Sequence, residues 1–469
     1  MLLTTAIKAL QQQIIHAQPE QTRITVDLQP LHSNELIEWF DAQILFPQFY
    51  WQSRDGDEEV VALGQCRHFH DLNSAKNQLS EHQRIWGGCA FSHQDYYFLP
   101  QIELTRKNNN WQLSVNLPTH LPEFNDTPAT GNIKNSAQQV YNEAVLLESL
   151  ANLITPAPTP IPLSYKVEAR SHYPEFKQWS HLVTKALTAI EQQCFAKVVL
   201  ARQSILTLNR PLSAAQFLQQ SRQVNQQCFH FIFALKPNDY FVGSTPERLF
   251  TRSQSQLRTE ALAGTAARGQ DVMKDRALAN WLLHDSKNRY ENRLVVDDLM
   301  SRLASRCTSL QVSMRPELIK LRKVQHLKHH ISGKLAAGVD DAELLTSLQP
   351  TAAIAGLPRQ AALDFIADNE PFSRGWYSGA LGYVGQQQSE FCVAIRSARI
   401  LGNELQLFAG AGIVPGSEPV SEWQELERKT ATLLSLLEPN SEMNADLDNN
   451  DNPSGDIGLH QFATEQQRA

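Results

Sequence analysis

Apolar and polar residues alternate with two different periods along this chain, and these periods separate a strand-rich first third from a mixed second part. Residues 49–64 predict two strands around the turn at Asp55 and Gly56. Residues 102–117 predict a second hairpin, closed by a run of asparagines. Residues 136–154 carry apolar positions at helical spacing and predict a helix.

The second part of the chain predicts helices and antiparallel strands in turn. Strand patterns cover residues 195–206, 228–266, 375–385 and 404–414. Helical spacing covers residues 175–193, 211–224, 271–306 and 421–437. We expect residues 271–306 to form one long helix. Pro211 is expected at a helix entry and Ser421 as the N-cap of the last helix.

Composition places two boundaries on this pattern. Alternating prolines in residues 155–164 exclude a helix or a central strand and predict an extended linker. Residues 438–469 are polar, acidic and nearly free of aliphatic side chains, which predicts a disordered tail. We therefore expect an N-terminal part over residues 1–165 and a catalytic domain over residues 173–437.

Bulk properties exclude several classes of function. The chain has 469 residues and a formal net charge of -7 with mixed signs, which argues against nucleic acid or an acidic membrane surface as the main partner. The sequence contains no apolar run long enough to predict a transmembrane helix, and residues 1–21 predict an amphipathic helix rather than a signal peptide. Its 6 cysteines include no CxxC pair, so we expect reduced thiols in a cytoplasmic protein and no zinc site.

Two predicted helices each carry carboxylates on one face. Lys287 and Glu291 are four residues apart, and Glu422 and Glu425 are three residues apart on the last helix. One interpretation is a pair of solvated helix faces. The other is that carboxylates from two distant helices converge on one cation, and oxygen ligands without a His or Cys cluster would suit Mg²⁺.

Glycines and a single arginine offer candidate anion sites. Gly410 and Gly412 end a predicted strand, where backbone N–H groups could approach a ligand, although such glycines can also mark a bulge. Gly264 and Thr265 could donate to an anion or simply turn the chain. Arg396 stands in an apolar strand pattern, and a buried arginine needs a carboxylate partner from the protein or from a substrate.

Two further charged residues stand in apolar surroundings. Lys197 opens a strand pattern, and it is either a strand-end charge that reaches solvent or a buried amine kept for its chemistry. Glu247 follows Pro246 in the segment GSTPERLF. It could be a general acid with a raised pKa, or it could form an ion pair with Arg248 or Arg252.

Taken together, the chemistry-bearing segments resemble the chorismate-utilising enzymes, and most closely the isochorismate synthases of the menaquinone type. The resemblance covers residues 176–437 and rests on these segments in this order: AKVVLAR, GSTPERL, LAGTAARG, SKNRYENRLVVDDL, VQHL, LQPTAAIAGLPR, GWYSGALGYVG, AIRSARI and GAGIVPGSEPVSEWQELERK. It implies an α/β (α+β) fold in which large antiparallel β-sheets pack as a sandwich with helices on the outside. The substrate site would then lie between the sheets.

The resemblance also assigns catalytic roles. Lys197 matches the general base that activates a water for attack on C2 of chorismate, and Glu247 matches the general acid that protonates the departing C4 hydroxyl. A free lysine is a poor base at neutral pH, so we expect burial and nearby cations to lower the pKa of Lys197. Glu291 and Glu425 match two Mg²⁺ ligands, with Glu422 beside them.

Other matched positions would bind the substrate. The family places four residues around the ring carboxylate and two around the enolpyruvyl carboxylate, while others line the pocket. In this chain the first group is Gly264, Thr265, Gly410 and Lys429, the second is Tyr377 and Arg396, and His326 and Thr351 complete the substrate-binding set.

Three features distinguish this chain from relatives in the family. The ammonia-using enzymes usually carry glutamine where Lys197 stands, so lysine favours water as the nucleophile. Ala263 stands where the aminodeoxychorismate enzymes carry a nucleophilic lysine. Gln349 and Ala352 depart from the common segment HPTPA and resemble the menaquinone type.

Several alternatives stay open. A siderophore-pathway isochorismate synthase or a salicylate synthase would share the base and the acid, and a non-catalytic chorismate-binding protein is a third alternative. Since water would be the nucleophile, we expect no glutamine amidotransferase subunit. A monomer or weak homodimer is expected, with Mg²⁺ as the cofactor.

Overall fold

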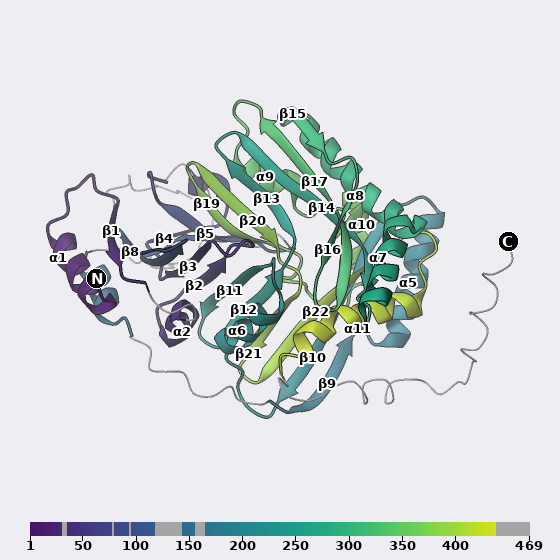
Figure 1. Cartoon of the computed structure of the whole chain (residues 1–469), viewed down its shortest axis with the longest axis horizontal. Coiled ribbons are helices and arrows are strands. Elements are labelled where there is room, and N and C mark those ends of the chain that lie inside the picture. The colour runs from purple at the N-terminus through teal and green to yellow at the C-terminus, as the bar shows by residue number, and fades with distance from the viewer. Residues whose placement is uncertain (31–34, 77–78, 93–94, 118–142, 155–164, 438–469) are drawn as a thin grey trace, which may run out of the picture.

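Two large antiparallel sheets form the body of the molecule, as the resemblance implied (Figure 1). The structure is a computed structural model that describes residues 1–30, 35–76, 79–92, 95–117, 143–154 and 165–437. The predicted linker 155–164, the predicted tail 438–469 and the first part of the predicted helix 136–154 lie outside these residues.

The larger sheet has 12 strands among the described residues, in the order β1-β8-β7-β3-β2-β11-β12-β21-β22-β10-β18, with β9 paired to β10. Their bounds are β1 Arg23–Leu28, β2 Gln48–Gln52, β3 Glu58–Leu63, β7 Ile102–Lys107, β8 Asn110–Asn116, β9 Val167–Tyr173, β10 Lys197–Leu208, β11 Phe229–Lys236, β12 Asp239–Thr245, β18 Gly356–Leu357, β21 Ser397–Leu401 and β22 Glu404–Ile413.

The smaller sheet has 10 strands in the described part of the chain, in the order β15-β17-β14-β13-β20-β19-β5-β6-β4, with β16 paired to β17. Their bounds are β4 Arg67–Phe69, β5 Arg84–Cys89, β6 Asp95–Leu99, β13 Arg248–Ser253, β14 Gln256–Ala267, β15 Cys307–Val312, β16 Glu317–Lys320, β17 Val324–Leu335, β19 Ala380–Gly385 and β20 Gln388–Val393.

Each sheet combines strands from the first third of the chain with strands from the remainder. Strand β2 pairs with β11 in the larger sheet, and β5 pairs with β19 in the smaller one. The N-terminal strands therefore complete both sheets by backbone hydrogen bonds, and strand pairing crosses the expected boundary near residue 165.

An aromatic core joins the inner faces of the two sheets. Phe49 and Trp51 from β2 pack with Trp86 from β5 and Tyr383 from β19, and all four side chains are buried. Ring centroids of Trp86 and Tyr383 lie 5.0 Å apart. Because alternate residues of a strand point to opposite faces, these side chains fill the space between the sheets.

Helices cover the outer faces, as expected from the family. Figure 1 shows α7, α8 and α11 grouped at one end of the molecule and α1 at the other, beside the N-terminal strands. None of the described helices is long and apolar enough to cross a membrane. The helices are α1 Leu3–Ile15, α2 Glu35–Ala42, α3 Leu72–Lys76, α4 Glu143–Ala151, α5 Phe176–Glu191, α6 Ala214–Val224, α7 Val272–His284, α8 Ser286–Ala304, α9 Asp341–Leu348, α10 Arg359–Asn369 and α11 Pro419–Leu434.

Three helix boundaries differ from the predictions. The expected single helix over residues 271–306 is two helices, because the Asp285 side chain accepts the backbone N–H of Asn288 and starts α8. Helix α6 begins at Ala214 with Ser213 as its N-cap, so Pro211 lies two residues before the cap rather than in the first helical turn. Helix α11 begins at Pro419, whose fixed φ suits the first helical turn, so Ser421 is not the N-cap.

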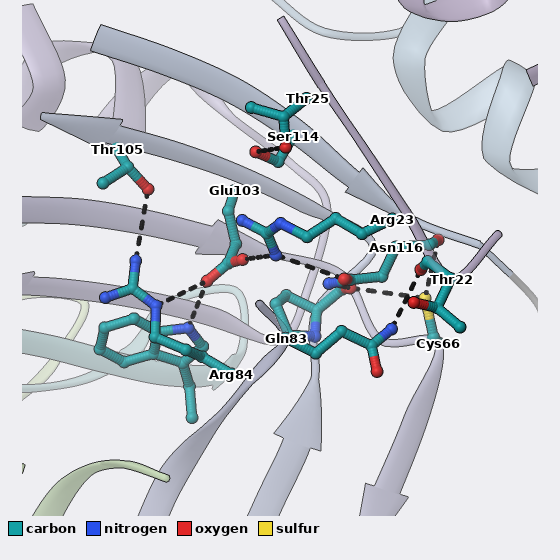
Figure 2. A network of polar contacts seen from close by, with 12 residues as sticks. Thr22, Arg23, Thr25, Cys66, Gln83, Arg84, Glu103, Thr105, Ser114 and Asn116 are labelled. Carbon is teal, nitrogen blue, oxygen red and sulfur yellow. Dashed lines mark hydrogen bonds and ion pairs between the residues drawn. The ribbon is translucent and has the colours of Figure 1, made fainter. Parts of the chain in front are cut away.

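A buried charge network holds the N-terminal strands together (Figure 2). Glu103 on β7 forms ion pairs with Arg23 on β1 and Arg84 on β5, and it accepts the indole N–H of Trp86 at 2.7 Å. Burial favours the neutral carboxyl, but the two arginines outweigh it and hold the pKa of Glu103 below its usual value.

Two neighbouring crossovers carry the chain between the sheets. Pro246 and Glu247 link β12 in the larger sheet to β13 in the smaller one, and residues 394–396 link β20 back to β21. The crossovers are bonded to each other, since Val393 N donates to Glu247 O at 3.0 Å and Ser244 N donates to Arg396 O at 3.2 Å. This topology brings Glu247 and Arg396 to the same place between the sheets.

Candidate active site

Lys197 begins β10 and is fully buried, with 0% of its surface exposed. Its Nζ lies 3.0 Å from Glu291 Oε1 on α8 and forms an ion pair with it. The charge nearest to Lys197 is thus an anion, whereas nearby cations were expected around it. Of the two interpretations of Lys197, the structure supports the buried amine over the solvated strand end.

Gly412 on the neighbouring strand β22 makes room for this pair. A Cβ at that position would lie 2.4 Å from Glu291 Oε1 and 3.0 Å from Lys197 Cε. Val199 is registered opposite Gly412, so the glycine stands beside the start of β10. The role of Gly412 is close side-chain approach rather than a bulge.

Carboxylates from α8 and α11 do converge, and lysines neutralise them. Lys287 Nζ lies 2.6 Å from Glu422 Oε1, and Lys429 Nζ lies 2.7 Å from Glu425 Oε1. Burial favours the neutral form of Glu291, but Lys197, Lys429 and Lys287 outweigh it and hold its pKa below the usual value. The solvated-face interpretation of these helices is therefore wrong.

The two lysines on these helices stay charged, and Glu422 differs from its neighbours. Burial works against the charged amines, yet Glu422 raises the pKa of Lys287 and Glu425 raises that of Lys429. Burial and the charge of Glu425 raise the pKa of Glu422. The two helices thus form one network of alternating charge.

Only two of these carboxylates match the family's metal positions. Within the described part of the chain, no three His, Cys, Asp or Glu side chains are placed to share one metal ion. Glu291 and Glu425 supply oxygen donors alone. The negative charges of both raise the pKa of Lys287 and of Lys429, so the two carboxylates act on the same neighbours. This donor set fits Mg²⁺, which takes few protein carboxylates and completes its octahedron with water or substrate oxygens.

Glu247 is enclosed at the first crossover, with 4% of its surface exposed. Burial and the negative charge of Glu260 raise its pKa to about 8, against the opposing charges of Lys197, Lys429 and Arg396. The ion-pair alternative is wrong, because Arg248 and Arg252 pair with other carboxylates.

Both arginines that could have neutralised Glu247 have other partners. Arg248 pairs with Glu390 at 3.1 Å, and Arg252 pairs with Asp341 at 2.7 Å. Glu247 is therefore a carboxylic acid at neutral pH, available to give up a proton.

His326 connects two strands to the second crossover. Its Nδ1 lies 3.1 Å from Thr265 Oγ1, and its Nε2 lies 2.6 Å from Arg396 Nη2. Burial, Arg396 and Lys429 hold the pKa of His326 well below its usual value. Because Arg396 can only donate, the hydrogen-bond pattern assigns the proton of this neutral ring to Nδ1.

Arg396 lies in the turn between β20 and β21, not within a strand as the sequence pattern suggested. Its φ of 50° is in the left-handed region, which costs energy for a side-chain-bearing residue. Burial lowers its pKa, and among the described carboxylates none forms an ion pair with it. The guanidinium thus retains donors for an anionic ligand.

Tyr377, Gly410 and Lys429 meet beside β22. Lys429 Nζ donates to Gly410 O at 2.8 Å, and a Cβ at Gly410 would lie 3.0 Å from Tyr377 Oη. The Tyr377 ring stacks on Phe408 with centroids 5.2 Å apart, and burial raises the pKa of its hydroxyl.

Gly264, Thr265 and Thr351 are placed less directly. Gly264 has a φ of +79° at a register shift within β14, so it allows a bulge in this strand. The Thr265 N–H donates to Asn288 Oδ1 at 2.9 Å and is not free for an anion. The Thr351 hydroxyl is buried and has no hydrogen-bond partner among the described residues.

A scan against family models matches residues 80–438 of this chain to the chorismate binding enzymes. The chain belongs to this family. The isochorismate synthase MenF of Escherichia coli (strain K12) is 40% identical over 93% of this chain and 99% of its own length. That of Haemophilus influenzae is 39% identical over 93% of this chain and 97% of its own length.

Solved structures agree with this family assignment. The menaquinone-specific isochorismate synthase MenF from Escherichia coli superposes with a TM-score of 0.83 at 39% identity, covering 93% of this chain and 99% of that one. Anthranilate synthase component I from Streptococcus pneumoniae, at 18% identity and a TM-score of 0.60 over 89% of this chain and 93% of that one, shares the fold. The predicted fold class is thereby confirmed.

Sequence reasoning missed several residues of the cluster. Asn288 holds Thr265, and Glu260 acts on Glu247 through its charge. Glu260 interrupts an apolar strand pattern, which was a usable signal for a buried charge. Arg54 ion-pairs with Glu260 from a predicted turn, where arginine carries no such signal.

Proposed function

We propose that this protein is an isochorismate synthase, in which water attacks C2 of chorismate and the C4 hydroxyl leaves. The observation that carries the proposal is a buried amine, Lys197, close enough to the buried carboxyl of Glu247 for its charge to act on the pKa of that carboxyl, which burial and Glu260 raise to about 8. Moving a hydroxyl between two ring carbons requires a base and an acid, and each transfer contributes roughly 10²–10⁴-fold.

Substrate carboxylates find complementary charge in the same cluster. Arg396 forms no ion pair with a carboxylate of the described residues, and the neutral His326 ring orients it through a 2.6 Å hydrogen bond. We assign it, with Tyr377, to the enolpyruvyl carboxylate, while Lys429 and the Gly410 backbone would face the ring carboxylate. Lysine rather than glutamine at position 197 supports water as the nucleophile.

We assign Glu291 and Glu425 as the residues that would hold Mg²⁺. A bound Mg²⁺ supplies positive charge that binds a substrate carboxylate. Glu291 also pairs with Lys197, so engagement of Glu291 elsewhere would release the amine from its ion pair and leave it available as a base. This coupling explains why one side chain would serve both the metal and the base.

Menaquinone biosynthesis is the role we propose, since the solved structure from Escherichia coli that matches 93% of this chain at 39% identity is described as a menaquinone-specific isochorismate synthase. We further propose a cytoplasmic monomer or weak homodimer that acts without a glutamine amidotransferase subunit. Water as nucleophile removes the need for a source of ammonia.

Chromatographic product analysis with chorismate and Mg²⁺, without any ammonia source, tests the proposal. Isochorismate in equilibrium with chorismate is the expected result, and Lys197→Ala serves as the matched inactive control. Salicylate with pyruvate would make the protein a salicylate synthase. Turnover that appears only after ammonium is added would refute the assignment of water as nucleophile.

A further inference from the structure

The backbone on both sides of Glu247 is held by one buried ion pair. Arg54 Nη1 donates to Pro246 O at 2.9 Å, and Glu260 Oε1 accepts the backbone N–H of Arg248 at 3.0 Å. Arg54 and Glu260 are themselves ion-paired. The pair therefore closes a bridge from the residue before Glu247 to the residue after it.

The two halves of this bridge come from distant parts of the fold. Arg54 stands in the turn between β2 and β3, 192 residues before Pro246, and Glu260 stands on β14. Their side chains are 11% and 1% exposed. Arg54 and Arg248 both lie over the Phe229 ring, at 5.6 and 5.5 Å from its centroid, which fixes the guanidinium planes.

We propose that the Arg54–Glu260 pair is a positioning element of the active site, which aims the Glu247 carboxyl and makes the N-terminal β2–β3 hairpin part of the catalytic machinery. This inference rests on the proposed function. Among the described residues, neither Arg54 nor Glu260 forms an ion pair with the lysines and glutamates of β10, α8 and α11, so both act through Glu247 and its neighbours in the chain.

The pair also sets the charge that Glu247 experiences. Lys197, Lys429 and Arg396 face Glu247 from three elements and favour its ionised form, while Glu260 is the facing group that opposes them. A neighbouring anion favours the protonated carboxyl that a general acid needs. Removing the Glu260 charge should thus shift the loss of activity at alkaline pH toward neutrality.

The test compares Glu260→Gln with wild type in kcat/KM profiles from pH 6 to pH 9. The amide can still accept the Arg248 N–H but no longer forms the ion pair with Arg54. We therefore expect a plateau lowered a few-fold and an alkaline limb moved to lower pH by roughly one pH unit. Glu103→Gln is the matched control, because Glu103 is an equally buried strand carboxylate held by arginines in the N-terminal network (Figure 2). The alkaline limb of the Glu103→Gln profile should stay at the same pH as that of wild type.

Arg54 variants separately test the hydrogen bond from Arg54 to the backbone carbonyl of Pro246. Arg54→Gln should lower kcat about tenfold at every pH while KM changes little, because a misaimed acid weakens the transition state more than binding. Arg54→Lys restores a cation and should recover part of the loss. If Glu260→Gln fails to fold, this pair of variants decides the question.

Two results would overturn the inference: an alkaline limb that is unmoved in Glu260→Gln, or an equal displacement in Glu103→Gln. A readout without turnover separates this failure from failure of the proposed function. The melting temperature of Glu247→Gln relative to its parent follows the titration of Glu247. The pH at which this difference in melting temperature develops should be lower in the Glu260→Gln background, even if chorismate proves not to be the substrate.

Discussion

Gly412→Ala is the substitution that most directly tests the geometry of the candidate base. The φ of Gly412 is outside the left-handed region, so alanine is compatible with the backbone. Its new methyl group would stand 2.4 Å from Glu291 Oε1 and 3.0 Å from Lys197 Cε. Since ordinary contacts begin near 3.5 Å, the Glu291 carboxylate must retreat by about 1 Å.

That displacement should cost activity rather than stability. A misplacement of about 1 Å in a catalytic group lowers rates about 10²-fold, which corresponds to about 2.7 kcal/mol of transition-state stabilisation. Alanine is more favourable than glycine within a strand by about 0.5–1 kcal/mol, which offsets part of the steric cost in the folded state. We therefore expect a melting temperature close to that of wild type and a severe loss of kcat.

The assay measures initial rates of isochorismate formation by chromatography at saturating chorismate over a Mg²⁺ series, with thermal melting of the same samples. Gly410→Ala is the graded comparison on the same strand, because its methyl group would meet Tyr377 Oη at 3.0 Å, a contact relieved by a few tenths of an ångström. Gly410→Ala should lower kcat only a few-fold. A Gly412→Ala enzyme with wild-type kcat and wild-type Mg²⁺ dependence would show that the Lys197–Glu291 arrangement is irrelevant to turnover.

The remaining predictions concern single charges. Lys197→Ala should abolish turnover while chorismate still binds in the presence of Mg²⁺ by calorimetry, and retained turnover would remove Lys197 from its role. Glu425→Gln should raise the Mg²⁺ concentration needed for half-maximal rate, and an unchanged requirement would contradict its assignment as a ligand. The pKa of Glu247 is raised from 4.5 unfolded to about 8 folded, so its contribution to stability is complete below pH 4.5 and is lost as pH rises toward 8. Glu247→Gln should therefore melt progressively higher than wild type between pH 5 and pH 9, and a pH-independent difference would refute the raised pKa.

Local patterns predicted most of the elements. Period-two alternation around the Asp55 turn gave β2 and β3, and the asparagine turn gave β7 and β8, because a strand or hairpin depends on residues that are neighbours in the chain. Helix ends were the weaker part. The break at Asp285 depends on one capping hydrogen bond that the continuous helical spacing concealed.

Charges in apolar surroundings were also visible in the sequence. Lys197, Glu247 and Arg396 all stood out as groups that are costly to bury, and all three lie in the cluster. What the sequence could not supply was the partner of each. Arg248 next to Glu247 was the obvious counter-ion, but the sheet register gives it Glu390, 142 residues away.

The sequence by itself thus determined the elements, the buried charges and the family, because periodicity, desolvation and ordered motifs are all properties of single segments. Only the tertiary structure decided that Glu291 stands against Lys197, that Lys287 and Glu422 meet across 135 residues, and that Arg54 reaches the crossover at Pro246. These pairings depend on sheet register, on two strand crossovers and on how the helices pack against the sheets. The local sequence of one segment does not indicate which distant segment will pack against it.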